Sequence, residues 1–456
     1  MKLQHAKFHF VGIGGIGMCG LAELLHNIGA KVSGSDLSEN ANTERLKELG
    51  VKVFKGHAAS HVGDADVVVY SSAIQYGNPE ISEARARQIP LIPRAEALAE
   101  IMRLKRGIAV AGTHGKTTTT SMTSAIFLEA NLSPTIVVGG RFELIKSTAM
   151  LGSGDWIVAE ADESDGSFHK LSPEIAIITN VDSDHLDHFK TFENLQKNFY
   201  DFALKVPFYG KVIACGDDPV IRQIFENFPK RILFYGFDER NDLVLSGEQG
   251  EYSLYRSDRL LGTRHHVGDF KLKVPGRHNA LNAVAAICSG VAAGIPFATC
   301  AKGLQRFEGV DRRFHFKGEK RGIKVYDDYG HHPTEVRAVL QAFREKYPAQ
   351  RLVVFFQPHR YTRTQHCWHD FTTAFKEADH VLLTDIYAAG EAPIPGISSE
   401  KLAQDMKHAN AQYFLRDEKA SQRLLGLLKE GDVFVTLGAG DGWKLGLEVL
   451  SQLEEN

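Results

Sequence analysis

Residues 107–117 read Gly-Ile-Ala-Val-Ala-Gly-Thr-His-Gly-Lys-Thr, an apolar run that leads directly into a short glycine loop. The apolar part, residues 107–111, predicts a buried strand, and the four threonines at 117–120 open a helix. Threonine is a poor helix former, but its hydroxyl group is a good partner for phosphate oxygens. A strand, a glycine loop and a helix in this order are typical of a phosphate-binding turn in an α/β protein.

Lys116 and Thr117 stand where a phosphate loop has its lysine and its Mg²⁺-binding hydroxyl group. The loop departs from the common pattern because Val110 occupies the position of the first glycine. Gly112 and Gly115 instead bracket two residues, which makes the loop shorter. A helix cap with an adjacent lysine is the alternative explanation, and the strand–glycine–helix context argues against it. We therefore expect this loop to bind the phosphates of ATP.

Short apolar runs alternate with helical patterns along most of the chain, which predicts α/β layers with parallel sheets. The 456 residues exceed one ordinary core and suggest about three domains of roughly 150 residues each. We place the boundaries so that the domains are 1–104, 105–309 and 310–456. Residues 238–273 differ because they alternate like hairpin strands, and a helix is expected from about Asn279. The other expected strands are 7–11, 31–35, 52–54, 67–70, 107–111, 156–159, 175–179, 324–326, 351–356, 380–384 and 432–437.

A second glycine loop, residues 12–17 (GIGGIG), lies between the expected strand at 7–11 and a helix that begins near Gly15. The spacing matches Gly-x-Gly-x-x-Gly, in which glycines permit a tight turn and the helix start offers free N–H groups to a phosphate. Asp36 ends the next strand, where a carboxylate would bind ribose hydroxyls if the nucleotide were NAD. Close packing of the helix on the strand is the alternative explanation. The motif predicts a bound nucleotide diphosphate without identifying the nucleotide.

Acidic segments follow two expected strands of the central domain. Since neighbouring parallel strands end in the same crevice as the phosphate loop, these side chains are candidate Mg²⁺ ligands. We expect Thr117, Glu160 and His185 to hold the metal, although histidine is an unusual ligand for Mg²⁺. The other acidic residues are expected to be mostly solvated loop charges or helix caps. They are Asp162, Glu163, Asp165, Asp182, Asp184 and Asp187.

The composition argues against several classes of protein. The formal net charge of −3 gives no basic field for nucleic acid or an anionic membrane. Five scattered cysteines favour reduced thiols over a disulfide framework, and no run of 18 apolar residues predicts membrane insertion. We interpret the N-terminal apolar stretch as a strand, a turn and a helix rather than a signal peptide, and we expect a cytoplasmic protein. The oligomeric state stays open.

Together these motifs resemble the Mur ligase family, whose central domain carries the short loop GTxGKT. The resemblance spans the whole chain. It implies three α/β domains: an N-terminal Rossmann-like domain that binds a UDP-sugar, a central P-loop ATPase-like parallel sheet that binds ATP, and a C-terminal Rossmann-like domain that binds an amino acid. The further motifs that carry the resemblance are 276–282 (GRHNALN), 312–314 (RRF), 327–333 (DDYGHHP) and 357–364 (QPHRYTRT).

The resemblance implies an ATP-dependent ligase that joins L-alanine to the lactyl carboxylate of UDP-N-acetylmuramate through an acyl phosphate, with two Mg²⁺ ions, in peptidoglycan precursor synthesis. The alternative within the family is the UDP-N-acetylmuramate–tripeptide ligase of cell-wall recycling, which shares GTHGKT and GRHN. The PHRYTR stretch favours L-alanine. A dehydrogenase would explain the N-terminal glycine loop but not GTHGKT. A phosphate-loop switch would leave the C-terminal motifs unexplained.

The resemblance also implies roles for individual residues. ATP would be bound by Gly112, Thr113, His114, Gly115, Lys116, Thr117, Thr118, Asn279, Asn282 and Arg313. The UDP-sugar would be bound by Gly14, Gly15, Ile16, Gly17, Asp36 and Ser71. The amino acid would be bound by Tyr329, His359, Arg360, Tyr361 and Arg363. Two arginines in that set suit a carboxylate clamp. The expected catalytic residues are Lys116, Glu160, His185, Asp328 and His331. One of the last two would accept the proton of the amine, or a water molecule or a phosphate oxygen would do so instead.

Overall fold

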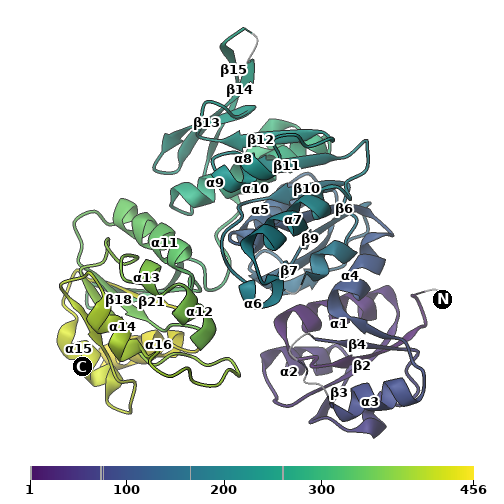
Figure 1. Ribbon diagram of the computed structural model, residues 1–456, viewed down its shortest axis with the longest axis horizontal. Coiled ribbons are helices and arrows are strands. Elements are labelled where there is room, and N and C mark those ends of the chain that lie inside the picture. The colour runs from purple at the N-terminus through teal and green to yellow at the C-terminus, as the bar shows by residue number, and fades with distance from the viewer. Residues whose placement is uncertain (1–2, 72–73, 75–76, 165, 259–260, 456) are drawn as a thin grey trace. The chain divides into compact units, whose positions relative to one another are not determined.

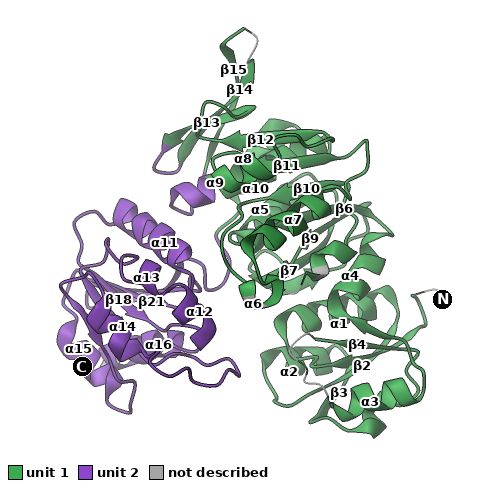
Figure 2. Ribbon diagram, viewed as in Figure 1, with its two compact units in different colours: residues 1–247, 251–271, 281–308 green, residues 248–250, 272–280, 309–456 purple. Residues whose placement is uncertain are grey.

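The computed structural model describes residues 3–71, 74, 77–164, 166–258 and 261–455. Its strands form three sheets of five, ten and six strands, joined by helices (Figure 1). The chain divides into two compact units, and the purple unit in Figure 2 consists of residues 248–250, 272–280 and 309–456. The first unit contains the first two sheets and the second unit contains the third. The predicted three-sheet α/β fold is therefore confirmed.

The first sheet is parallel throughout, with strand order β3-β2-β1-β4-β5. Its strands are β1 (Lys7–Val11), β2 (Lys31–Asp36), β3 (Lys52–Lys55), β4 (Val67–Tyr70) and β5 (Leu91–Pro93). The helices between them are α1 (Ile16–Ile28), α2 (Ala41–Glu48), α3 (Pro79–Ala86) and α4 (Arg94–Met102). Chain order reverses between β1 and β4, and ligands of such sheets bind in the crevice at this reversal. The strand, turn and helix expected at the N-terminus are confirmed.

The second sheet has the order β15-β14-β13-β12-β11-β10-β6-β9-β7-β8. Its strands are β6 (Arg106–Ala111), β7 (Thr135–Phe142), β8 (Ser147–Met150), β9 (Trp156–Glu160), β10 (Ile175–Ile178), β11 (Lys211–Cys215), β12 (Ile232–Gly236), β13 (Leu243–Glu248), β14 (Glu251–Asp258) and β15 (Thr263–Lys271). β6 lies between β10 and β9 and pairs in parallel with both. The phosphate loop therefore leaves the sheet beside the ends of the two strands that precede the acidic segments.

Helices and antiparallel strands complete the first unit. The helices are α5 (Lys116–Glu129), α6 (Leu186–Phe189), α7 (Phe192–Ala203), α8 (Pro219–Ile224), α9 (Arg277–Ala292), which continues from the second unit, and α10 (Phe297–Gln305). The hairpin expected within 238–273 is confirmed by the antiparallel pair β14–β15. The helix expected from about Asn279 begins two residues earlier, at Arg277. Gly276, with φ of +98°, precedes it.

The third sheet has the order β16-β17-β21-β18-β19-β20 and is parallel except for the β16–β17 pair. Its strands are β16 (His315–Lys320), β17 (Ile323–Asp328), β18 (Leu352–Phe356), β19 (His380–Leu383), β20 (Ala411–Tyr413) and β21 (Val433–Leu437). Its helices are α11 (Pro333–Lys346), α12 (Tyr361–His366), α13 (Trp368–Phe371), α14 (Ser399–Asp405), α15 (Ala420–Leu427) and α16 (Trp443–Glu455). Successive β18 residues enter two different apolar clusters, so the sheet is buried on both faces.

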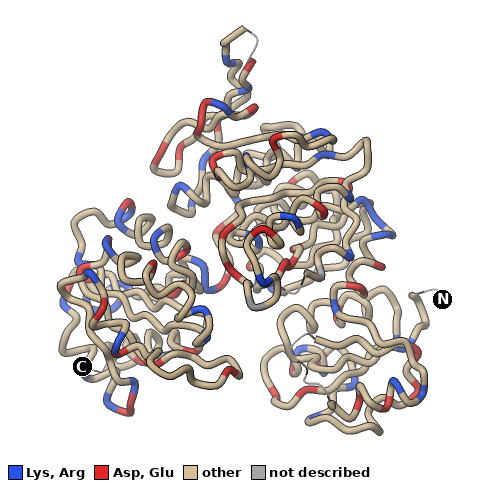
Figure 3. The backbone as a smooth tube through the Cα atoms, viewed as in Figure 1, with Lys and Arg blue, Asp and Glu red and all other residues tan. Residues whose placement is uncertain are grey.

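Several global features agree with the composition. Lys and Arg are interspersed with Asp and Glu along the described parts of both units (Figure 3). All five cysteines are buried, and no disulfide joins any of them. Among the described residues, no helix combines the length and the apolar character needed to cross a membrane.

Candidate active site

Two glycines shape the phosphate loop between β6 and α5. Gly112 and Gly115 have φ of +135° and +81°, in the region that favours glycine. A Cβ atom on Gly112 would overlap Oγ1 of Thr179, and one on Gly115 would lie 2.8 Å from Oδ1 of Asn282. The loop is therefore enclosed by the segment after β10 and by α9. Of the residues expected to bind ATP, Asn282 is placed directly against it.

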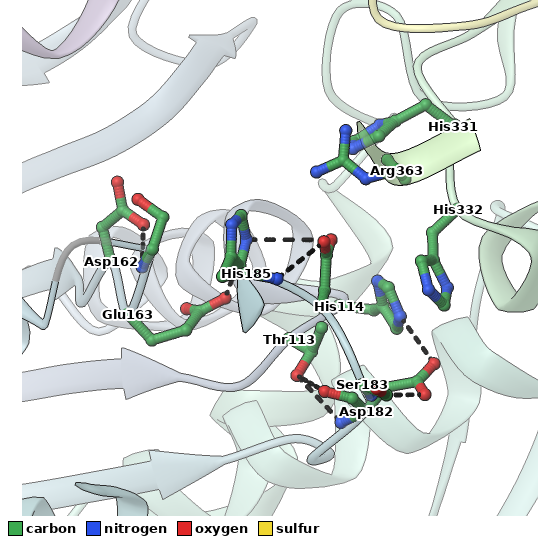
Figure 4. Close-up of polar contacts among 12 residues, drawn as sticks. Thr113, His114, Asp162, Glu163, Asp182, Ser183, His185, His331, His332 and Arg363 are labelled. Carbon is green, nitrogen blue, oxygen red and sulfur yellow. Dashed lines mark hydrogen bonds and ion pairs between the residues drawn. The ribbon is translucent and has the colours of Figure 1, made fainter. Parts of the chain in front are cut away.

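The segment after β10 also fixes the loop through hydrogen bonds (Figure 4). The N–H group of His114 donates to Oδ1 of Asn180 at 2.8 Å, and Nε2 of His114 lies 3.0 Å from Oδ2 of Asp182. The N–H group of Asp182 donates to Oγ1 of Thr113 at 2.9 Å. Thr113 and His114 thus anchor the loop to the neighbouring strand end, and Asp182 is part of this anchor.

The ammonium group of Lys116 is held by three residues of the first unit. Its Nζ donates to the carbonyl groups of Gly112 at 2.7 Å and Thr113 at 3.1 Å, and it lies 2.8 Å from both carboxylate oxygens of Glu163. The Glu163 side chain is 0% exposed. The expectation of a solvated loop charge is therefore wrong for Glu163. Asp165, in the same segment, lies outside the described residues.

Burial and charge act in opposite directions on this ion pair. Burial raises the pKa of Glu163 to about 7, against the lowering effect of Lys116. Burial also lowers the pKa of Lys116, but the carboxylates of Glu163, Asp162 and Glu160 raise it by more. Lys116 therefore remains a cation, as binding to phosphate requires.

The expected metal ligands lie around the same loop. Glu160 ends β9, and its Oε2 accepts the N–H group of Gly139 at 2.8 Å. His185 has φ of +57°, and its Nε2 lies 3.7 Å from Oε1 of Glu163. Thr117 occupies the first turn of α5. The carboxylate and the hydroxyl group are oxygen donors of the kind that Mg²⁺ prefers, whereas the imidazole is an unusual ligand for it.

The N-terminal glycine loop is fixed by polar side chains of the next strand and helix. Oδ2 of Asp36 accepts the N–H group of Gly14 at 2.8 Å, and Nδ2 of Asn42 donates to the carbonyl group of Gly14 at 2.8 Å. The Asp36 carboxylate thus shapes the loop itself. Gly15 caps α1, Ile16 begins it, and the N–H group of Ser71 donates to the carbonyl group of Val11 at 3.4 Å.

Arg94 is a basic side chain at this loop that the sequence did not single out. A Cβ atom on Gly17 would lie 3.0 Å from Nη1 of Arg94, so the guanidinium lies against the first turn of α1. Nη2 of Arg94 is 3.4 Å from Oδ2 of Asp162. Arg94 therefore connects the N-terminal loop with the acidic segment after β9. The sequence gives no local signal for this, because the arginine begins an ordinary helix.

The second unit brings four of its expected site residues together from the ends of β17 and β18. The rings of His331 and His359 are 5.7 Å apart, and those of Tyr329 and His331 are 5.4 Å apart. Nη1 of Arg363 lies 3.4 Å from both Nδ1 and the carbonyl oxygen of His359. Arg360 precedes α12 with φ of +69°, a strained value for arginine. Tyr361 is the first residue of α12.

Asp328 and the arginines beside it shape the same strand end. Asp328 is 2% exposed and accepts the N–H groups of Phe314 and Gly330, each at 2.7 Å. Burial raises the pKa of Asp328 to about 6, although Arg313 lowers it.

Arg313 pairs with Glu335 at 3.3 Å. Arg313 and Asn279, both expected at ATP, belong to the second unit. Nδ2 of Asn279 donates to the carbonyl group of Pro275 at 2.6 Å.

Comparison with known proteins covers the chain from end to end. Residues 7–106 match "Mur ligase family, catalytic domain", residues 110–290 match "Mur ligase middle domain", and residues 312–440 match "Mur ligase, glutamate ligase domain". A protein of Bdellovibrio bacteriovorus called UDP-N-acetylmuramate–L-alanine ligase is 89% identical over 453 residues, which cover 99% of this chain and 100% of the relative. This chain belongs to the Mur ligase family.

Solved Mur ligases share the fold. UDP-N-acetylmuramate–alanine ligase from Thermotoga maritima is 29% identical, with a TM-score of 0.81 over 99% of this chain and 100% of that one. A murein peptide ligase from Psychrobacter arcticus is 23% identical, with a TM-score of 0.73 over 99% of both chains. The family resemblance and the three-domain α/β architecture expected from the sequence of this Mur ligase are confirmed.

Proposed function

We propose that this Mur ligase joins L-alanine to the lactyl carboxylate of UDP-N-acetylmuramate, with conversion of ATP to ADP and phosphate, in peptidoglycan precursor synthesis. The observation that carries the proposal is the 89% identity, over essentially the full length of both chains, to a ligase with that name. A second relative with the same name, from Trichlorobacter lovleyi, is 48% identical over 98% of this chain. The alternative is the tripeptide ligase of cell-wall recycling. It is disfavoured because this chain is 23% identical to the murein peptide ligase but 89% identical to the L-alanine ligase of Bdellovibrio bacteriovorus.

The first chemical step transfers a phosphoryl group. A carboxylate oxygen of the sugar attacks the γ-phosphorus of ATP, the bond from the γ-phosphorus to the bridging oxygen breaks, and ADP leaves. Such a transfer depends mainly on positioning and charge neutralisation. In our proposal Lys116 binds the β- and γ-phosphates and the loop residues cradle them. Mg²⁺, held by Thr117, Glu160 and His185, supplies neutralisation of the phosphate charge when bound.

The second step forms the amide bond. The amine of L-alanine attacks the acyl carbon, phosphate leaves, and the nitrogen loses a proton. The planar guanidinium groups of Arg360 and Arg363 suit the α-carboxylate of a small amino acid, and Tyr329, His359 and Tyr361 line the same position. Of the two expected proton acceptors we favour His331, because Asp328 is only 2% exposed. Both oxygens of Asp328 already accept backbone N–H groups.

We assign the UDP-sugar to the N-terminal glycine loop, with Gly14, Gly15, Ile16, Gly17, Asp36 and Ser71. The corresponding domains are 1–104 for the UDP-sugar, 105–309 for ATP and 310–456 for the amino acid. ATP binding would also use Thr118, Asn279, Asn282 and Arg313. Because ATP and UDP-sugars are cytoplasmic metabolites, we propose that the protein works in the cytoplasm.

The deciding experiment measures phosphate release with ATP, Mg²⁺ and UDP-N-acetylmuramate, comparing L-alanine with the tripeptide L-Ala-γ-D-Glu-meso-diaminopimelate. Release with alanine alone, together with one equivalent of the new amide, is the expected result. Preference for the tripeptide would assign the protein to cell-wall recycling. Release with neither amine would overturn the ligase proposal altogether.

A further inference from the structure

We propose that Glu163 is a positioning residue that latches Lys116 onto the phosphate loop, and that a nucleotide phosphate must displace it. The inference rests on the proposed binding of ATP to this loop. It concerns a carboxylate to which neither the motifs nor the expected metal ligands give a role. Two features of the structure support it: the number of acceptors around Nζ of Lys116, and the burial of Glu163.

The donors of Lys116 are fully used by the protein. An ammonium group has three N–H donors. Those of Lys116 meet the carbonyl group of Gly112 at 2.7 Å, that of Thr113 at 3.1 Å, and the Glu163 carboxylate at 2.8 Å. A phosphate that approaches Nζ must therefore replace one of these acceptors. The two carbonyl groups belong to the loop that would cradle the phosphate, which leaves Glu163 as the acceptor that gives way.

The segment that carries Glu163 is held in place independently of Lys116. The N–H group of Gly166 donates to the carbonyl group of Glu163 at 2.8 Å, closing a turn. In the same segment, Oδ1 of Asp162 accepts the N–H group of Ser164 at 3.0 Å, and Oδ2 of Asp162 lies 3.4 Å from Arg94. These contacts fix the backbone around the carboxylate. Lys116 and Glu163 therefore separate by a movement of their side chains rather than by unfolding of the segment.

Removal of the negative charge of Glu163 should change the stability of the chain and its affinity for the nucleotide in opposite directions. Glu163→Gln keeps the shape of the side chain but leaves the buried Lys116 cation without its counter-ion, which is unfavourable. A bound phosphate would then supply the missing charge without competing against a carboxylate. The variant should therefore be less stable than the parent chain by itself, and yet bind the nucleotide more tightly. A residue that only supports the fold would weaken both properties together.

The experiment titrates the full-length chain with the β,γ-imido analogue of ATP by calorimetry, with and without Mg²⁺. Glu163→Gln is expected to lower the Kd measured without Mg²⁺ by about tenfold, which corresponds to about 1.4 kcal/mol. Glu163→Asp, which keeps the charge but shortens the side chain, should give an intermediate Kd. It also replaces the glutamine variant as the test if the latter does not fold.

Glu174→Gln is the matched control. Glu174 pairs with Arg106 at 2.6 Å and 2.9 Å, at the opposite end of β6 from the phosphate loop. This variant breaks a more exposed ion pair, with side chains 48% and 17% exposed, and should leave the Kd unchanged. An unchanged or higher Kd for Glu163→Gln without Mg²⁺ would overturn the latch, and weakening seen only with Mg²⁺ would make Glu163 a metal ligand instead. Failure of the parent chain to bind the analogue would contradict the proposed function itself.

Discussion

Lys116 is the side chain on which the contacts of the phosphate loop converge. Its substitution by alanine removes the cation that is proposed to neutralise the transferring phosphoryl group. Loss of one such transition-state contact typically costs at least a hundredfold in kcat. We expect Lys116→Ala to reduce phosphate release by about a thousandfold or more. Lys197→Ala, on an exposed lysine paired with Asp201, is the control and should retain full activity. Comparable activity in both variants would exclude Lys116 from the chemistry.

Arg360 and Arg363 are proposed to bind the carboxylate of L-alanine, so their loss should weaken binding of this substrate more than it slows the chemical steps. We expect Arg360→Ala and Arg363→Ala each to raise the KM for L-alanine roughly tenfold or more, with a smaller change in kcat. Steady-state kinetics at saturating ATP and UDP-sugar measures both constants. Arg337→Ala, an exposed arginine of α11, is the control. An unchanged alanine KM would remove the substituted residue from the amino-acid site.

Asp328 gives the stability of the second unit a dependence on pH. Burial raises its pKa from 3.8 to about 6, so the folded chain holds this proton more tightly than the unfolded chain. The protonated Asp328 carboxyl group therefore makes its full contribution to the free energy of unfolding below pH 3.8. This contribution is lost as the pH rises through 6. The loss amounts to about 3 kcal/mol for a shift of roughly two pKa units. Asp328→Asn removes the titration, although it also loses one hydrogen-bond acceptor.

The difference in Tm between Asp328→Asn and the parent chain tests this reasoning. The variant should gain relative to the parent between pH 4 and pH 6, and the difference should then level off. The lost acceptor shifts the whole curve by a constant amount and leaves its shape unchanged. A difference in Tm that stays flat across this range would show that the Asp328 carboxyl group titrates at its ordinary pKa.

At the scale of elements, the strand–loop–helix turn of β6 and α5 depends on backbone geometry. Gly112→Ala places a methyl group where φ is +135° and against Oγ1 of Thr179. We expect it to lower the Tm and to abolish binding of the ATP analogue. Gly426→Ala, within α15, meets nothing within 4 Å and should leave the Tm unchanged or slightly raised. Normal nucleotide binding by Gly112→Ala would mean that the loop tolerates another backbone conformation.

Elements with strong local signals were predictable from the sequence. β1 and β4 have the predicted bounds because each is a short apolar run that ends at a polar or glycine turn. β5, three residues long, and β8, at the edge of the second sheet, were not predicted. Such short strands are defined by pairing with a neighbour rather than by their own pattern. The loop around Lys116 was also predictable from a local pattern, because its residues are consecutive in the sequence.

Contacts between distant residues were not predictable. Glu163 lies 47 residues from Lys116, and its sequence segment looks like any acidic surface loop. Only the parallel pairing of β6 with β9 brings that segment to the loop. Arg94 and Asp162 meet across 68 residues for a similar reason. A single sequence therefore indicates candidate residues but not the distant partners that hold them.

At the scale of the whole molecule, the proposed reaction divides its groups between two compact units. The phosphate loop and the N-terminal glycine loop belong to the first unit, while His331 and Arg363 belong to the second. An acyl phosphate reacts readily with water, so the amine must meet it in a site from which water is excluded. Closure of a protein around its ligands is a common way to exclude water from a reaction.

We therefore expect the chain to become more compact when ATP analogue, Mg²⁺ and UDP-N-acetylmuramate are bound together. Small-angle X-ray scattering should show a smaller radius of gyration with the full set of ligands than without them. The Lys116→Ala variant serves as the control, because weaker engagement of the phosphates should reduce the change. Identical scattering profiles with and without ligands would contradict closure.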